Sequence, residues 1–267
     1  MTETIGFVGL GALGAPVAAN LLEAGYALRV HNRTRSKADA LVEKGAVWAR
    51  SPAEAADGAT MVVTLLWDDA SVEDVVGGDG FLETLSEGVH VSMSTISPAC
   101  ARQLAGLHAR HGSRLVTAPI FGIPEAAKTR ALWLPVAGPK DVQVRVQSVL
   151  EAAGAKGIFD FGEDVGAAVA VKIAGNFLIV SAAESLGQAL SLAKAEGVDP
   201  HAFIDMLTKT LFPSPIYVGN GRTLAEGRNM MRRSKIAAKD LGLFAEVARG
   251  AKVETDIVDA LKTLPAG

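Results

Sequence analysis

The sequence predicts an α/β fold in two parts: a doubly wound, mostly parallel sheet followed by an all-helical domain. Over about the first 160 residues, short apolar runs alternate with segments of helical apolar spacing, which indicates βαβ units and a sheet covered on both faces. After about Glu163 the apolar residues repeat at helical spacing, and no strand is evident. We therefore expect a sheet domain over residues 1–162 and a helical domain over residues 163–267.

Strands and helices are expected in turn along the first domain. Each expected strand is a short apolar run, and most of the segments between them repeat apolar residues at helical spacing. The expected strands cover residues 5–8, 27–30, 60–66, 89–92 and 114–117. The expected helices cover residues 16–24, 36–44, 52–56, 71–76 and 98–111.

The second domain begins with an expected helix from Gly166 to Glu196, which contains no proline and is followed by Gly197, a residue suited to a C-terminal cap. At about 1.5 Å per residue this helix is about 45 Å long, as in spines shared between domains or subunits. Its apolar residues surround much of its circumference, which favours a homodimer. Further helices are expected over residues 200–211, 217–226 and 235–251.

Composition limits the classes of function. The net charge is −3, so no overall positive field attracts nucleic acid or an anionic membrane surface. With one cysteine, Cys100, neither a disulfide framework nor a multi-cysteine zinc site is expected, and we interpret Cys100 as a small core residue. No metal site is predicted. The N-terminus lacks the features of a secretory signal and no continuous apolar run reaches about 18 residues, so we expect a cytoplasmic protein.

The first expected strand leads into G-x-G-x-x-G, with its glycines at Gly9, Gly11 and Gly14. Gly9 permits a tight turn, Gly11 lets the backbone approach a pyrophosphate, and Gly14 lets the following helix pack on the strand. The helix N-terminus then meets the anion. The motif predicts a Rossmann-type domain, with Leu10, Ala12 and Leu13 in the same cofactor site; the alternative is a glycine-rich turn without a ligand.

The second expected strand leads into His31-Asn-Arg-Thr-Arg-Ser-Lys37. An NAD site places Asp or Glu here, about 20 residues after the glycines, to bind the ribose 2′-hydroxyl. This stretch has no carboxylate but has three cations and two hydroxyls, and a guanidinium such as Arg33 pairs well with a 2′-phosphate. We therefore expect NADP (NADPH) rather than NAD, bound by Asn32, Arg33 and Thr34; the alternative is a solvated basic loop.

A lysine interrupts the long apolar helix. Lys172 lies among small and apolar residues, and Asn176 follows one turn later on the same face. Such a lysine either extends its ammonium to solvent or is held for chemistry. A nicotinamide enzyme that reduces a carbonyl needs a proton donor for the oxygen, which an ammonium supplies. We predict that Lys172 is the general acid/base and that Asn176 hydrogen-bonds the substrate oxygen.

These stretches resemble the β-hydroxyacid dehydrogenase family, which includes 3-hydroxyisobutyrate dehydrogenase, tartronate semialdehyde reductase and the glyoxylate/succinic semialdehyde reductases. The resemblance is carried, in the family's order, by residues 9–21 (GLGALGAPVAANL), 94–98 (STISP), 166–176 (GAAVAVKIAGN) and 239–241 (KDL). It implies that Thr95 borders the nicotinamide, that Lys172 is the family's acid/base lysine and that Lys239 lies near the active site. It also implies cofactor contacts at Leu66 and Lys239 and substrate contacts at Ser97 and Gly122.

The chain departs from the family where the family reads D-A-P-V-S-G-G. Here the stretch is Thr117-Ala-Pro-Ile-Phe-Gly-Ile-Pro124, with Phe121 at the serine position and Ile123 at the second glycine. The ring removes a hydroxyl donor and fills space, so a small hydroxy acid becomes a weaker expectation, unless Phe121 simply packs on the sheet. We include Phe121 and Ile123 among the expected substrate contacts.

Two further departures are expected to affect the surface or the cleft. Arg130 stands where the family commonly has glycine, and we interpret it as a surface charge rather than an anion-binding residue. The chain after Ala248 is expected to be shorter than in the family. Trp133, Phe212 and Tyr217 are either pocket or core residues.

Three functions remain open at this point. The leading one is an NADPH-dependent reductase of a small aldehyde or ketone, which oxidises a hydroxy acid in reverse. The apolar I-F-G-I-P stretch resembles imine reductases, which share the two-domain build but usually carry Asp or Tyr at the position of Lys172, so an imine reductase-like enzyme is one alternative. A non-catalytic NADP-binding scaffold is the other, and the retention of Lys172 and Asn176 counts against it.

Overall fold

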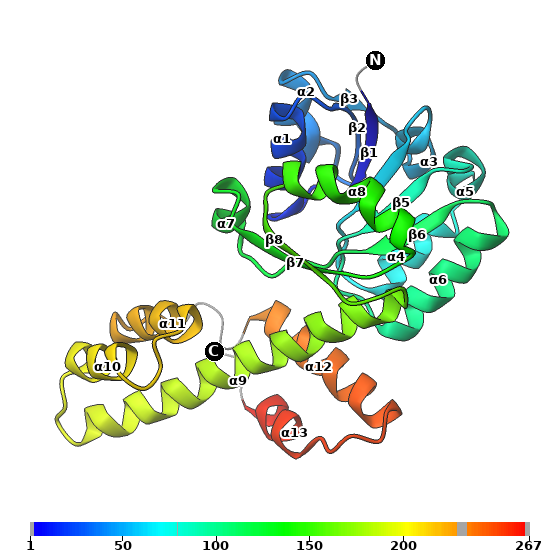
Figure 1. Cartoon of the computed structure of the whole chain (residues 1–267). Coiled ribbons are helices and arrows are strands. Elements are labelled where there is room, and N and C mark those ends of the chain that lie inside the picture. Colours follow the sequence, from blue (N-terminus) through cyan, green and yellow to red (C-terminus); the bar gives the residue numbers. More distant parts are fainter. Residues whose placement is uncertain (1–2, 79, 229–233, 265–267) are drawn as a thin grey trace. The chain divides into compact units, whose positions relative to one another are not determined.

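The structure is a computed structural model that describes residues 3–78, 80–228 and 234–264 (Figure 1). The chain divides into two compact units, Met1–Lys172 and Ile173–Gly267. The division falls inside the longest helix, α9 (Val165–Ala195), which therefore contributes residues to both units.

The first unit contains a six-stranded sheet in the order β3-β2-β1-β4-β5-β6, and every pair in it is parallel. The chain starts in the middle of the sheet, winds outward to β3 and then crosses back to β4, so the topological switch point lies between β1 and β4. This order confirms the predicted doubly wound fold. The strands are β1 (Thr4–Val8), β2 (Ala27–His31), β3 (Val47–Trp48), β4 (Met61–Thr64), β5 (Val89–Ser92) and β6 (Arg114–Thr117).

Helices cover both faces of this sheet, which explains why β4 and β5 are buried along their whole length (Figure 1). One face carries α1 (Gly14–Glu23), the 3₁₀ helix η1 (Arg35–Ala38), α2 (Asp39–Glu43) and α8 (Lys140–Ala152). The other carries α3 (Pro52–Ala56), α4 (Asp69–Val76), α5 (Phe81–Leu85) and α6 (Pro98–Arg110). Each face has its own apolar core.

A second, two-stranded parallel sheet is formed by β7 (Leu132–Val136) and β8 (Ala155–Asp160), with α8 as the crossover between them. It follows α7 (Pro124–Lys128), and antiparallel bridges join Thr117 to Ala137 and Phe121 to Trp133. Sequence patterning did not predict this sheet. Strand β7 contains a proline and β8 is largely exposed, so neither shows the alternation typical of a strand.

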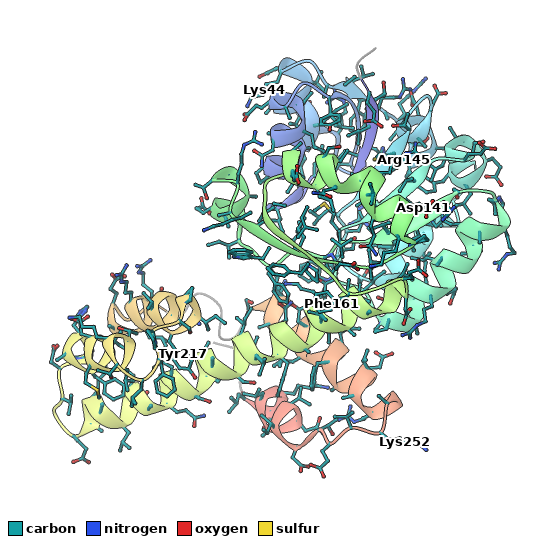
Figure 2. All side chains as sticks on the ribbon, in the orientation of Figure 1. Lys44, Asp141, Arg145, Phe161, Tyr217 and Lys252 are labelled. Atoms are coloured by element: carbon teal, nitrogen blue, oxygen red, sulfur yellow. The ribbon has the colours of Figure 1, made fainter. Side chains whose placement is uncertain are left out.

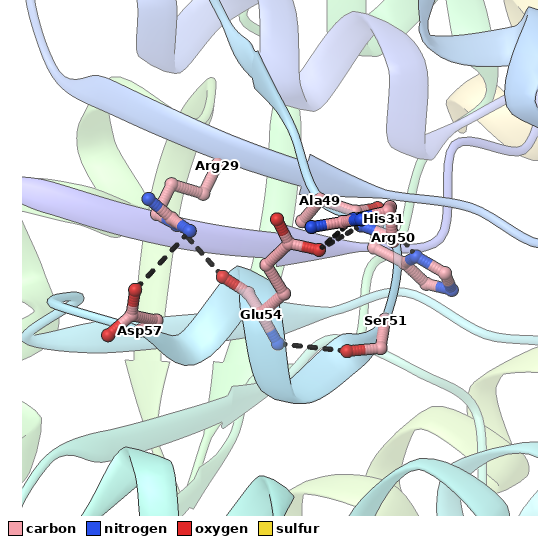
Figure 3. Close-up of polar contacts among 7 residues, drawn as sticks. All are labelled: Arg29, His31, Ala49, Arg50, Ser51, Glu54 and Asp57. Carbon is pink, nitrogen blue, oxygen red and sulfur yellow. Dashed lines mark hydrogen bonds and ion pairs between the residues drawn. The ribbon is translucent and has the colours of Figure 1, made fainter.

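Helix α3 is fixed to strand β2 of the large sheet by a group of polar contacts (Figure 3). The Ser51 hydroxyl accepts from the Glu54 backbone N–H (3.0 Å), and the Glu54 carboxylate accepts from the Arg50 N–H (2.7 Å), which together resemble a capping box. Arg29 in β2 donates to the Glu54 carbonyl (2.8 Å) and pairs with Asp57 (3.5 Å). These contacts hold the strand that leads into the basic loop.

The second unit contains the later part of α9 followed by α10 (Pro200–Lys209), α11 (Pro215–Ala225), α12 (Lys235–Gly250) and α13 (Asp256–Thr263). Among the described residues of this unit no strand occurs, which confirms the predicted helical domain; α13 was not expected. One core joins α9 to α10 and α11 and another joins it to α12 and α13. Tyr217, labelled in Figure 2, stacks on Phe212 with ring centres 4.6 Å apart.

Helix α9 is long and apolar enough to span a membrane by length and composition alone. Within its own unit, however, Val180 packs with Leu241 and Val258, and Leu190 packs with Ile204. These contacts are those of a core helix.

Candidate functional site

The glycine-rich turn after β1 contains two glycines that the packing requires and one that faces open space. A Cβ on Gly9 (φ +106°) would lie 2.3 Å from the Leu65 carbonyl oxygen, and a Cβ on Gly14 would lie 2.0 Å from the Gly9 oxygen. Close backbone packing therefore requires these two glycines. A Cβ on Gly11 would meet nothing within 4 Å. The open space beside Gly11 fits the close approach of a pyrophosphate.

Asn32 joins this turn to the loop after β2. Its side-chain oxygen accepts from the Leu10 N–H (2.9 Å), and its amide donates to the Thr34 carbonyl (2.9 Å). Asn32 was predicted as a cofactor contact, and the structure shows that its amide braces the two loops against each other. The Leu10 N–H is thereby already engaged within the protein.

The three cations of the basic loop have different surroundings. Arg35 pairs with Asp39 and lies over the ring of Trp48, 4.6 Å from its centre. Lys37 lines a shallow groove between α1 and α2. Arg33 is exposed and forms no ion pair within the part of the chain that the structure describes, so its guanidinium is accessible to an anion. Trp48 in turn stacks on His31, whose ring nitrogen Nδ1 lies 2.9 Å from the Ala49 carbonyl oxygen.

The loop between β5 and α6 carries Thr95, which is half-buried. Beside it, the Ser94 hydroxyl accepts from the Leu66 N–H (2.8 Å). Ser97 caps α6 by accepting from the Cys100 N–H (3.0 Å), and its hydroxyl donates to Asp69 (2.6 Å). The Ser97 hydroxyl is therefore engaged within the protein, where it fixes the loop that presents Thr95.

Cys100 is buried, as predicted for a core residue. Burial, with smaller contributions from Asp69 and Glu73, raises the pKa of its thiol to about 12. The side chain is therefore a neutral thiol near neutral pH and a poor nucleophile.

The start of α9 is fixed to the carboxyl end of β6. The Thr117 hydroxyl donates to the Val165 carbonyl (2.7 Å), and Asp164 accepts from the Gly166 N–H (2.9 Å). Arg102 pairs with Asp164 (2.7 Å), and its hydrogen bonds lower the pKa of that carboxyl. A Cβ on Gly166 would lie 2.7 Å from the Arg102 guanidinium, so the glycine permits this packing.

Lys172 is buried, with only 7% of its surface exposed, so the alternative of a lysine that extends to solvent is wrong. Its Nζ lies 4.3 Å from the centre of the Phe121 ring. The backbone of Phe121 exchanges two hydrogen bonds with Trp133 (2.9 and 3.0 Å). A Cβ on Gly122 would lie 2.4 Å from a Leu132 methyl group, so this glycine lets the segment pack on β7.

In the second unit, Asn176 on α9 meets the K-D-L stretch of α12. Its Nδ2 donates to Asp240 Oδ2 (2.6 Å), and Lys239 Nζ lies 3.1 Å from Asp240 Oδ1. Asn176 and Asp240 are both buried. Sequence reasoning selected Lys239 but not Asp240. The signal was present, because Asp240 interrupts the apolar positions Ala237, Leu241 and Ala245 in the same way that Lys172 interrupts α9.

Several other candidates lie on the surface. Arg130 donates to the Ala152 carbonyl (2.9 Å) and pairs with Glu23 (3.4 Å), which confirms it as a surface charge. Ile123 precedes α7 and is 55% exposed. Trp133 and Phe212 are 42% and 40% exposed, so neither is a core residue.

A doubly wound parallel sheet with an open glycine turn is the architecture of a dinucleotide-binding domain, and here a helical domain follows it. The chain belongs to the β-hydroxyacid dehydrogenase family. Residues 4–162 match the family described as the NAD binding domain of 6-phosphogluconate dehydrogenase. Residues 166–265 match the family described as NAD-binding of NADP-dependent 3-hydroxyisobutyrate dehydrogenase.

Among curated relatives, the chain is 38% identical to the uncharacterized oxidoreductase YfjR of Bacillus subtilis, over 97% of this chain and 91% of that protein. It is 30% identical to an NAD-dependent L-serine dehydrogenase of Pseudomonas aeruginosa, over 95% and 88% of the two chains.

Solved structures of related enzymes superpose on nearly the whole chain. A 3-hydroxyisobutyrate dehydrogenase of Mycobacterium tuberculosis, solved with L-serine, superposes with a TM-score of 0.86 at 26% identity, over 98% of this chain and 92% of that one. A reductive aminase of Aspergillus terreus, solved with NADPH and ethyl levulinate, gives 0.72 at 25% identity, with the same shares covered.

Proposed function

We propose that this protein is an NADPH-dependent reductase of a small aldehyde or ketone, which oxidises the corresponding alcohol or hydroxy acid in reverse. The observation that carries the proposal is the burial of Lys172. Asn176 follows it by one helical turn on the same face of α9 and is hydrogen-bonded to Asp240. Burying an ammonium in an apolar helix costs desolvation free energy, so a lysine at this position favours a role in the chemistry of the site.

NADPH is the proposed cofactor, and when bound it supplies the hydride. The turn formed by residues 9–14 would cradle its pyrophosphate, and Arg33, with Asn32 and Thr34, would hold the 2′-phosphate. Leu66, Thr95 and Lys239 are the remaining proposed cofactor contacts. One relative is described as NAD-dependent and one matching family as NADP-dependent. The proposed preference for NADPH over NADH therefore rests on Arg33 and on the lack of a carboxylate in the loop after β2.

Lys172 is the proposed proton donor. In the direction of reduction its ammonium gives a proton to the substrate oxygen, and in reverse its neutral amine removes that proton. Asn176 would hydrogen-bond the same oxygen without adding charge. Phe121, Gly122 and Ile123 are the proposed substrate contacts, and Ser97 contributes by ordering the loop that carries Thr95.

An imine reductase-like activity is the second candidate. The apolar side chains of Phe121 and Ile123 favour it, as does the likeness to the reductive aminase. The lysine at position 172 favours a carbonyl substrate, because an oxygen that becomes an alkoxide needs a proton during hydride transfer.

We further propose a cytoplasmic homodimer, with a cofactor domain over residues 1–162 and a helical substrate and dimerisation domain over residues 163–267. Leu178 and Leu192 on α9 are 62% and 67% exposed in the single chain, and a second copy would cover them. Light scattering at micromolar concentration tests this, and a monomer would contradict it.

NADPH oxidation tests the main proposal. The purified protein is assayed with glyoxylate, succinic semialdehyde, methylglyoxal and a cyclic imine, beside Lys172→Ala and the control Lys194→Ala, an exposed lysine of the same helix. We expect turnover of an aldehyde that falls about 10²–10⁴-fold in Lys172→Ala and stays unchanged in the control.

Three other outcomes of this assay would change the proposal. Preference for the imine would favour the second candidate. Undiminished turnover in Lys172→Ala would refute the role of the lysine, and tight NADPH binding without any turnover would favour a scaffold.

A further inference from the structure

The ammonium of Lys172 is faced by an aromatic ring. Its Nζ lies 4.3 Å from the centre of the Phe121 ring, within the range of a cation–π interaction. Because only 7% of Lys172 is exposed, the ring helps to replace the water that the charge has lost. The side of the ammonium nearest Phe121 is therefore apolar.

Both partners are fixed within the first unit. The two backbone hydrogen bonds to Trp133 hold Phe121 in register with β7. The Thr117 hydroxyl and the Arg102–Asp164 ion pair hold the start of the helix that carries Lys172. The backbone segments that carry the ring and the lysine are therefore both held by contacts within this unit.

Phe121 offers an anion nothing to bind. Its ring has no N–H or O–H, and the negative face of the ring repels a carboxylate. Its backbone N–H is already donated to the Trp133 carbonyl (2.9 Å). Ile123, two residues further on, is 55% exposed and has no polar side-chain group to offer either. A substrate carboxylate packed on the ring would lose its water without gaining a donor from Phe121, whereas an alkyl or aryl group would lose nothing.

We propose that Phe121 is a specificity-determining residue that selects uncharged carbonyl compounds, with an apolar substituent packed on its ring, against carbonyl compounds that carry a carboxylate at that position. This inference rests on the proposed function and names its substrate class. Lys172 supplies the proton to either kind of substrate, so Phe121 affects the choice of substrate and leaves the chemical step in place.

A matched pair of substrates tests the proposal: succinic semialdehyde and its methyl ester, which differ in the charge of one group. The measured quantity is the ratio of kcat/KM for the ester to kcat/KM for the acid, with NADPH saturating. We expect the ester to be preferred by the natural protein. In Phe121→Ser, which adds a hydroxyl donor and space, we expect that ratio to fall by about 10- to 100-fold.

Two variants separate specificity from damage to the fold. Phe121→Leu keeps an apolar side chain and should keep the preference for the ester. Phe159→Ser is the same change of residue type at a half-exposed ring of β8 that contacts Trp133. It should leave the ratio unchanged. Loss of stability alone lowers both kcat/KM values together and does not move their ratio.

The proposal is overturned if the natural protein reduces the acid better than the ester, or if Phe121→Ser leaves the ratio where it was. A failure of the proposed function gives a different result, namely no NADPH-dependent reduction of either compound or equal turnover in Lys172→Ala.

Discussion

Asn176 donates from Nδ2 to Asp240 Oδ2 over 2.6 Å, and both side chains are buried in the second unit. The hydrogen bond decides which way the amide points, because the carboxylate accepts only from the amide nitrogen. Lys239, 3.1 Å from the other oxygen, balances the charge of that carboxylate. Asp240 is thus placed to orient Asn176, and we predict that it is a positioning residue.

Asp240→Ala should lower kcat by up to about 100-fold, because a misplaced Asn176 no longer holds the substrate oxygen in a productive position. Steady-state kinetics and NADPH affinity are measured together, and Asp240→Asn, which retains part of the hydrogen bonding, should recover some activity. Asp205→Ala removes an exposed carboxylate of the same unit and serves as the control. Unchanged kcat in Asp240→Ala would contradict the positioning role.

The glycine turn allows a paired prediction. Gly11→Ala should leave the thermal midpoint unchanged and weaken NADPH binding, since its Cβ enters the open space proposed for the pyrophosphate. Gly14→Ala should lower the free energy of unfolding by about 1–3 kcal/mol, because its Cβ overlaps the Gly9 carbonyl oxygen. Calorimetry and fluorescence titration distinguish the two effects. Equal loss of stability in both variants would be evidence against a cofactor role for Gly11.

Arg33 decides the proposed preference for NADPH. Arg33→Ala should weaken NADPH binding by about 10- to 100-fold, the loss expected for hydrogen bonds to a charged group, and leave NADH binding unchanged. Arg35→Ala is the matched control, because that guanidinium is engaged with Asp39 and Trp48. Titration with both cofactors gives the ratio directly, and a ratio that Arg33→Ala does not alter would exclude this residue as the 2′-phosphate ligand.

A buried chain of hydrogen bonds crosses one face of the large sheet. Ser113 donates to the His108 carbonyl (3.3 Å), so its oxygen accepts from His108 Nδ1 (2.8 Å). His108 Nε2 then accepts from His90 Nδ1 (2.9 Å), and His90 Nε2 accepts from the Thr64 hydroxyl (2.8 Å). Each ring carries one N–H proton and is neutral, and a second proton on His108 would remove the acceptor of the bond from His90.

This chain makes stability depend on pH. Burial, the larger cause, and the neighbouring histidine lower the pKa of His90, and burial lowers that of His108 from an ordinary 6.5 to about 4. Below pH 6.5 the unfolded histidines take up protons that the folded ones exclude. The contribution of the two histidines to the free energy of unfolding is therefore complete above pH 6.5 and is lost towards pH 4. The loss is up to about 1.4 kcal/mol per pH unit for each histidine.

Urea unfolding at pH 7.5, 6.5, 5.5 and 4.5 measures this slope. His108→Gln should make it shallower, while His201→Gln, at an exposed histidine outside the chain, controls for the substitution itself. A slope that His108→Gln leaves unchanged would show that the buried histidines do not cause the loss of stability in acid.

Much of the first domain could be predicted, because its strands and helices show in the residue types of short segments of the chain. The mostly apolar runs at β1 and β4 are almost wholly buried, and they are recognised directly from residue type. The sheet of β7 and β8 was not predicted, because β7 contains a proline and its partners, Phe121 and β8, lie elsewhere in the chain. Likewise, Asn32 is recognisable as part of a cofactor loop, but its bond to the Leu10 N–H depends on how two loops meet.

The sequence by itself determined the doubly wound fold, the glycine turn and the presence of a lysine in an apolar helix, since each follows from residue type and spacing along the chain. Only the tertiary structure decided what surrounds these residues: the ring of Phe121 against Lys172, the carboxylate of Asp240 against Asn176 and the open space at Gly11. The physical reason is that periodicity fixes which face of an element is buried, whereas the partners of a buried charge or amide come from segments far away in the chain.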